Sequence, residues 1–317
     1  MQKKTITIGA TLVVIIVAAA VFAAWYFSNQ SPQTKTTAQA VSNQSSIIQV
    51  VAGENFWGSL VSQLGGTRTQ VLSIVTDPNA DPHEYESNSV DAQAIANASF
   101  VIVNGAGYDD WALKLIAASN NPHQVVLNVA SLLGKKQGDN PHFWYSPYYV
   151  NDTVNAMYSD LVSIDPADAS YFTQQYASLN SSIGVYNARI SEIKHQFAGT
   201  KVASTESIFE YLANATGLDL VSPPAFMEAV AEGNDPPAQS VVQFQQQIQN
   251  RTVSVLVYNA QTVTPLTQNM KAMAAAKGIP ILAVTETIQP PDTTFQVWMN
   301  AELISLQNAL NAQTLGQ

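Results

Sequence analysis

Short apolar segments rich in β-branched residues alternate with helical patterns in two series along this 317-residue chain. The first series has strand-like segments at 47–52, 69–75, 100–104 and 124–129, with helical patterns at 55–64, 89–96 and 109–118. The second has strand-like segments at 201–205, 219–222, 253–258 and 281–285, with helical patterns at 207–216, 240–250, 265–277 and 294–310. Strands that alternate with helices form βαβ units. The alternation therefore predicts an α/β fold with two four-stranded parallel sheets.

A long segment without strand character, residues 151–196, separates the two series. Its helical pattern breaks at Asp165-Pro166, where the aspartate is a suitable cap for the helix that follows. From 167 to 196 the pattern is compatible with one continuous helix, far longer than the usual ~11–12 residues. We therefore expect two lobes, residues 47–165 and 199–317, joined by a long rigid connecting helix at 166–198.

The N-terminal segment is apolar enough to enter a membrane. Residues 5–27 carry no charge, and a helix needs only about 20 apolar residues to cross a bilayer. Because Lys3 and Lys4 precede this segment, the rest of the chain is expected outside the cytoplasm. Residues 1–28 are thus a single-pass membrane anchor or, alternatively, a cleaved signal that leads to secretion. Residues 29–46, rich in Ser, Gln, Thr and Asn, are expected to be a flexible linker.

The charge balance and the cysteine count narrow the function classes. The chain has 13 Lys and Arg against 23 Asp and Glu, a net charge of −10, which argues against a nucleic-acid partner. It has no cysteine, which excludes disulfides, thiolate metal sites, a cysteine nucleophile and a lipid-modified cysteine anchor. A metal site in this chain must therefore use nitrogen and oxygen ligands.

Four candidate metal ligands follow strand-like segments. His83 and His142, two of only four histidines, each come directly after a proline in such a loop, and Glu206 and Glu286 come directly after the fifth and eighth segments. Open parallel sheets bind ligands beyond the carboxyl ends of their strands. If the two lobes face each other, these four side chains converge. Two imidazoles and two carboxylates suit a divalent cation such as zinc or manganese.

Each of these residues also has an ordinary interpretation. A loop histidine is usually solvated, and we expect this for His123, which precedes a strand, and for His195, which lies on the long helix. Glu206 and Glu286 could be carboxylates that stabilise helix N-termini. The segment Phe143-Trp144-Tyr145 could be a partner-binding patch, although packing around a site is the commoner role. The matched placement of the two proline-linked histidines favours the metal hypothesis.

From about residue 47 to the C-terminus, the sequence resembles the metal-binding receptors of bacterial and archaeal ABC importers for zinc and manganese. The resemblance rests on Asp81-Pro82-His83-Glu84-Tyr85, on Asn140-Pro141-His142-Phe143-Trp144-Tyr145-Ser146-Pro147, on Val202-Ala203-Ser204-Thr205-Glu206-Ser207-Ile208-Phe209, and on Val284-Thr285-Glu286-Thr287. It implies two α/β lobes joined by a long rigid helix, with the metal bound between them.

The same resemblance assigns the ligands. It implies that His83 and His142 bind the metal and that Glu206 occupies the third position, which is His or Glu in the family. The fourth ligand of the family is commonly Asp, whereas Glu286 stands there in this chain, and Asp292 in the following loop is the alternative. The chain also lacks the family's frequent His-rich loop and its lipoprotein cysteine, so an uncleaved N-terminal helix could replace the lipid.

The function implied by the resemblance is that of a monomeric extracytoplasmic solute-binding protein, not an enzyme. Such a protein captures Zn²⁺ or Mn²⁺ and delivers it to an ABC permease. One alternative is a membrane-anchored surface adhesion module with an incidental metal site. The other is a metal-dependent hydrolase with Glu84 as general base. That hydrolase is disfavoured because the sequence after His83 lacks the second histidine of an HExxH motif.

Overall fold

The computed structural model describes residues 20–26, 28–29, 47–79 and 81–315. The chain divides into two compact units, Met1–Gln44 and Ser45–Gln317. In the first unit, residues 20–26 are helical. Among the described helices, none combines the length and the apolar character that a membrane crossing requires. The anchor predicted at 1–28 and the linker predicted at 29–46 lie largely outside the described residues.

The second unit begins with a four-stranded parallel sheet in the order β2-β1-β3-β4. Its strands are β1 (Ile48–Glu54), β2 (Thr69–Val75), β3 (Phe100–Val103) and β4 (Val125–Asn128). Its helices are α2 (Asn55–Gly65), α3 (Ser89–Asn97), α4 (Asp110–Ser119) and α5 (Val129–Leu132). Val50 in the central strand β1 pairs with Val71 on one side and Phe100 on the other, which fixes the register. The carboxyl ends of all four strands therefore meet at one edge of the sheet.

A second four-stranded parallel sheet follows, in the order β6-β5-β7-β8. Its strands are β5 (Lys201–Ser204), β6 (Asp219–Leu220), β7 (Val255–Asn259) and β8 (Ile281–Val284). Its helices are α8 (Glu210–Thr216), α9 (Pro224–Ala231), α10 (Ala238–Gln249), α11 (Pro265–Ala276) and α12 (Phe295–Leu315). The strand order repeats that of the first sheet, so the chain uses one topology twice.

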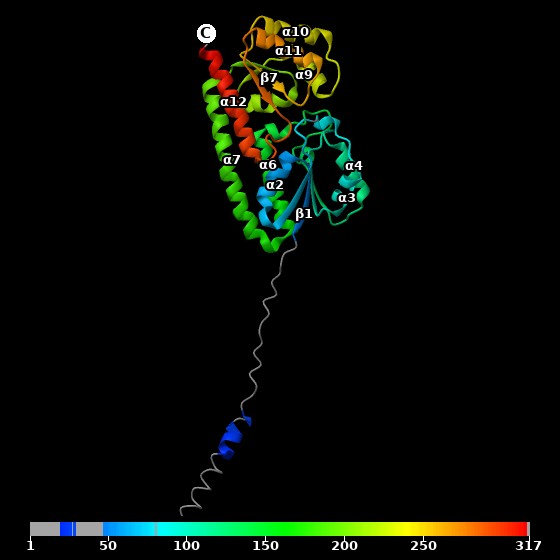
Figure 1. Cartoon of the computed structure of the whole chain (residues 1–317), viewed down its shortest axis with the longest axis vertical. Coiled ribbons are helices and arrows are strands. Elements are labelled where there is room, and N and C mark those ends of the chain that lie inside the picture. Colours follow the sequence, from blue (N-terminus) through cyan, green and yellow to red (C-terminus); the bar gives the residue numbers. More distant parts are fainter. Residues whose placement is uncertain (1–19, 27, 30–46, 80, 316–317) are drawn as a thin grey trace, which may run out of the picture. The chain divides into compact units, whose positions relative to one another are not determined.

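Two helices connect the sheets. The first, α6 (Pro147–Ile164), is capped by Ser146, whose hydroxyl accepts from the backbone N–H of Tyr149. The 3₁₀ turn Pro166–Asp168 separates α6 from α7 (Ala169–Phe197). The side chain of Asp165 caps this turn by accepting from the backbone N–H of Ala167. With 29 residues, α7 is roughly 43 Å long at about 1.5 Å per residue. It extends along one side of both sheets, with α12 beside it (Figure 1).

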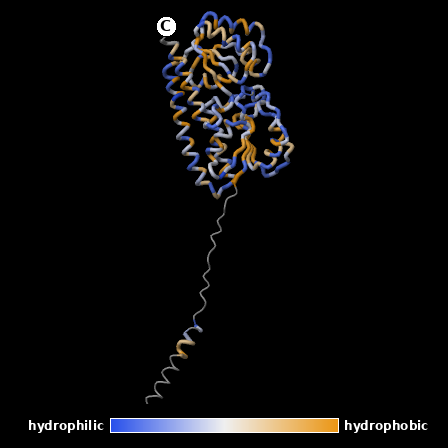
Figure 2. Tube along the Cα trace, in the orientation of Figure 1, coloured by the Kyte–Doolittle hydropathy of each residue, from blue (hydrophilic) through white to orange (hydrophobic). Residues whose placement is uncertain are grey.

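Apolar side chains hold the two lobes on one continuous core. Both sheets are hydrophobic at their strands (Figure 2). The largest buried cluster takes residues from β1, α2, α6, α7, β5, β7 and α12, and thus from both lobes. The outer face of the first sheet packs on α3 and α4, and that of the second on α9, α10 and α11. Since each sheet is covered on both faces, only the strand ends and their loops are free to form a site.

The predicted fold class, two lobes with four-stranded parallel sheets joined by a long helix, is confirmed. The sequence interpretation did not predict α9, which begins at Pro224 directly after Pro223. Proline is in fact favoured in the first turn of a helix, where its missing N–H has no partner in any case, and Pro224 begins α9 there. The last helix also extends to Leu315, beyond the predicted 294–310, because it packs along α7.

Candidate metal centre

The four predicted ligands lie at the carboxyl ends of four strands. His83 is in the 3₁₀ turn Pro82–Glu84 after β2, and His142 immediately precedes the 3₁₀ turn Phe143–Tyr145 after β4. Glu206 lies two residues after the end of β5 and immediately precedes a third such turn, and Glu286 lies two residues after the end of β8. The first two come from one lobe and the last two from the other. The structure brings all four together between the lobes.

The distances within the cluster are short. His83 Nε2 lies 3.4 Å from Glu286 Oε2, and His142 Nε2 lies 3.8 Å from the same oxygen. His142 Nε2 is also 3.9 Å from Glu206 Oε1. One ligand atom from each of His83, His142 and Glu286 lies within 4.8 Å of the other two. This spacing leaves room for a cation with metal–ligand bonds of about 2.0–2.2 Å.

Three of the ligand atoms are buried and have no hydrogen-bond partner among the described residues: His83 Nε2, His142 Nε2 and Glu206 Oε2. The side chains of His142, Glu206 and Glu286 are fully buried, while that of His83 is 21% exposed. A buried polar atom without a partner costs about 1–3 kcal/mol. A metal ion would give each of these converging atoms a partner. The residues therefore fit a divalent cation.

Burial sets the protonation states of the cluster. It lowers the pKa of His142 well below the ordinary value, and the nearby His83 lowers it further, so this imidazole is neutral. Burial also raises the pKa of Glu206, and the neighbouring Glu286 carboxylate raises it further. Only neutral imidazole and ionised carboxylate bind metal. The neutral imidazole of His142 is therefore ready to bind a metal, whereas the raised pKa of Glu206 means that protons compete with the metal for this carboxylate.

Two further side chains at strand ends orient the carboxylates. Asn259, the last residue of β7, donates through Nδ2 to Glu206 Oε1 at 2.9 Å and to Glu286 Oε1 at 2.8 Å. The Tyr108 hydroxyl, in the loop after β3, donates to Glu286 Oε2 at 2.7 Å. The sequence interpretation missed both residues. Both lie where the carboxyl ends of parallel strands gather ligands, but neither residue type is a usual metal ligand.

The loop that carries Tyr108 has an unusual backbone. Gly105, Ala106 and Gly107 all have positive φ angles, of 77°, 58° and 92°. A Cβ at Gly105 would lie 2.5 Å from Asn128 Oδ1, so only glycine fits there. Asp109 holds the loop from its other end by accepting from the backbone N–H groups of Asn104 and Gly105. The loop is thereby fixed in the form that directs Tyr108 to Glu286.

The remaining candidates lie elsewhere. Asp292 is in an exposed turn, and none of the contacts in the described part of the chain joins it to the cluster. His123 and His195 are exposed, as predicted. The segment Phe143–Tyr145 is fully buried and packs beside the site, with Trp144 stacked on Phe56 at 3.9 Å between ring centroids. It is therefore part of the core and not a surface patch.

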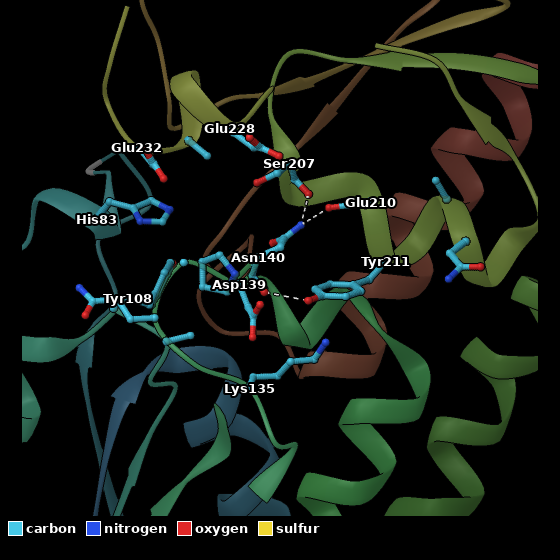
Figure 3. Close-up of a pocket in the computed structure, with 18 of the residues that line it drawn as sticks. His83, Tyr108, Lys135, Asp139, Asn140, Ser207, Glu210, Tyr211, Glu228 and Glu232 are labelled. Carbon is cyan, nitrogen blue, oxygen red and sulfur yellow. Dashed lines mark hydrogen bonds between the residues drawn. The ribbon is translucent and has the colours of Figure 1, made fainter. Parts of the chain in front are cut away.

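A cavity of about 1080 Å³ opens beside the cluster. His83 and Tyr108 line it from the first lobe, and Ser207, Glu228 and Glu232 line it from the second (Figure 3). Among the four candidate ligands, only His83 is in this lining. Three of the four candidate ligands are thus fully buried, and the fourth, His83, reaches a wide, acidic opening.

The chain is similar to known metal-uptake proteins in sequence. A family model described as ZnuA, the periplasmic component A of a zinc-uptake complex, matches residues 50–309. The manganese-binding lipoprotein MntA of Halalkalibacterium halodurans is 27% identical over 184 residues, which are 55% of this chain and 59% of MntA. The chain spans between 50% and 59% of the length of the curated relatives considered.

The fold is also similar to that of solved structures. The periplasmic zinc-binding protein TroA from Treponema pallidum has a TM-score of 0.71 at 16% identity, over 82% of this chain and 98% of TroA. A mutant structure of the laminin-binding adhesin Lmb from Streptococcus agalactiae has a TM-score of 0.69 at 17% identity, over 83% of this chain and 99% of Lmb. At these identities the likeness is one of fold.

Proposed function

The chain belongs to the ZnuA family of periplasmic zinc-uptake components, and from that membership we propose that it captures a divalent metal ion with His83, His142, Glu206 and Glu286. The observation that carries the proposal is that both lobes contribute buried ligand atoms, three in all, which lack hydrogen-bond partners in the described part of the chain. An adhesive or structural role alone gives no reason for such atoms to converge. A bound cation supplies each of them with a partner.

The proposed cargo is zinc or manganese. Imidazole nitrogen suits zinc and carboxylate oxygen suits manganese, and the site offers two residues of each kind. In a site that fits both ions, the Irving–Williams order gives zinc the higher affinity. The names of MntA and TroA, one manganese-binding and the other zinc-binding, support the same pair of ions.

We further propose how the chain works in a cell. Residues 1–28 hold it at the outer side of the membrane as an anchor, or direct its secretion if they are cleaved, and residues 29–46 act as a tether. The lobes 47–165 and 199–317, connected by 166–198, hold the ion and deliver it as a monomer to an ABC permease. The acidic cavity beside His83 is the proposed path of the ion, since negative side chains attract cations.

The alternatives have less support. The likeness to the adhesin Lmb is one of fold, and fold does not determine function. A hydrolase needs a general base beside a metal-bound water. Glu84, the candidate base, is exposed, whereas the ligand atoms are buried.

Metal retention tests the proposed function. The metal-stripped full-length chain, purified in a non-ionic detergent, would be mixed with equimolar Zn²⁺, Mn²⁺, Mg²⁺ and Ca²⁺, then desalted and analysed for metal content. We expect one zinc or manganese ion per chain. Glu206→Ala should abolish retention, and Glu232→Ala, which removes an exposed carboxylate from the cavity wall, should not. If the wild-type chain retains neither zinc nor manganese, the proposal is wrong.

A further inference from the structure

The side-chain amide of Asn140 uses all of its hydrogen-bonding capacity. Its Oδ1 accepts from the backbone N–H of His142 at 3.1 Å and lies 2.7 Å from Nδ1 of the same residue. Its Nδ2 donates to the backbone carbonyl of Ser207 and to Glu210 Oε2, each at 2.8 Å (Figure 3). A primary amide has two donor hydrogens and two acceptor lone pairs. All four are therefore occupied.

These contacts determine the tautomer of His142. A backbone N–H can only donate and a backbone carbonyl can only accept, so the contacts with His142 N and Ser207 O identify the two ends of the Asn140 amide. Because Oδ1 is an acceptor, His142 Nδ1 carries the hydrogen. The lone pair of His142 Nε2 is then free, and within the described residues this buried atom has no hydrogen-bond partner.

The same amide crosses from one lobe to the other. Asn140 lies in the loop after β4, and Ser207 directly follows the candidate ligand Glu206 after β5. The Tyr211 hydroxyl on α8 adds a second link by donating to the backbone carbonyl of Asn140 at 2.8 Å. One residue thus contacts the ring of His142 in the first lobe and the backbone beside Glu206 in the second.

We propose that Asn140 is a positioning residue that sets both the tautomer of His142 and the separation of His142 from Glu206 across the cleft. The inference rests on the proposed metal function. The proposed role of Asn140 requires a side-chain amide at this position. A carboxylate at this position would still accept from the imidazole, as in many metal sites. It would, however, place a second oxygen against the Ser207 carbonyl and the Glu210 carboxylate.

Asn140→Asp separates the two roles. We expect the metal-free variant to keep the Nδ1–H tautomer of His142, observable by long-range ¹H–¹⁵N NMR, because the carboxylate remains an acceptor. We expect its Zn²⁺ affinity, measured by competition with a chelator on the full-length chain, to fall about 10–100-fold, the usual effect of losing an outer-shell partner. Adding Glu210→Gln supplies an amide donor and should restore most of that loss.

The controls make the test decisive. Glu210→Gln alone should bind zinc as the wild type does, because its amide oxygen can still accept from Asn140. Tyr211→Phe removes only one hydroxyl and should weaken zinc binding several-fold, which provides a second variant if Asn140→Asp does not fold. Unchanged or tighter zinc binding by Asn140→Asp would overturn the proposal, as would an equal loss with and without Glu210→Gln. Absence of zinc and manganese binding by the wild type would instead overturn the metal function itself, and this inference with it.

Discussion

Replacing Asn259 by leucine should destabilise the metal-free protein much more than the zinc-bound protein. The Asn259 amide donates to both Glu206 and Glu286, and all three side chains are fully buried. Each hydrogen bond to a charged group contributes about 1.5–3 kcal/mol. Uptake of a proton by Glu206 offsets part of the loss, because burial and the nearby Glu286 already raise the pKa of this carboxyl group. We therefore expect a net loss of about 2–4 kcal/mol without metal.

Calorimetric unfolding measures this difference. Because the entropy of unfolding is about 2.1 cal/mol/K per residue, a loss of that size lowers Tm by roughly 4–7 °C in the folded unit Ser45–Gln317. With saturating zinc the cation itself stabilises both carboxylates, so the decrease in Tm should be less than half as large. Asn151→Leu, which changes an exposed asparagine on α6, is the matched control and should leave Tm nearly unchanged. Equal decreases for Asn259→Leu with and without zinc would refute the reasoning.

Two further predictions concern protons. Glu54, at the end of β1, is buried, and burial raises its pKa, as does the neighbouring Asp109 carboxylate. Because the folded state holds this proton more tightly, stability falls as pH rises above the unfolded pKa near 4.5. Glu54→Gln should therefore raise Tm by a few degrees at pH 7.5, with a gain that shrinks toward pH 4 in thermal scans; a gain independent of pH would contradict this. Metal binding should release the proton of Glu206, so zinc affinity should fall by up to about tenfold per pH unit in acid. Calorimetry at pH 7.5 and 5.5, in buffers of different ionisation enthalpy, measures both effects, and equal affinity at the two pH values would count against this ligand set.

Much of the fold could be predicted because its elements are local. The strands coincide with apolar segments, and β2 occupies the predicted residues 69–75. The strand order could not be read from the chain, because it depends on which helices cover which face. The packing of α12 along α7 could not be predicted either. Residues such as Leu303 and Leu306 on α12 become buried only when the chain has folded.

The residues of the candidate site also differ in whether the sequence could identify them. His83, His142, Glu206 and Glu286 could be selected because each follows a strand, and the structure places them together. Whether they bind metal stays a prediction. Asn259 was overlooked because an asparagine at a strand end has no distinctive pattern, although the structure places it between two carboxylates. Such roles depend on loops from both lobes that meet only in the folded chain.

The central claim is that His142 and His83 bind a divalent metal ion, and calorimetric titration tests it most directly. Zinc, and then manganese, would be titrated into the metal-stripped full-length chain, into His142→Ala and into His123→Ala, the last of which removes an exposed histidine that precedes the amino end of β4. We predict one-to-one binding by the wild type and by His123→Ala, and an affinity lower by orders of magnitude for His142→Ala, which should fold normally. Wild-type affinity in His142→Ala, or no binding by the wild type, would contradict the account.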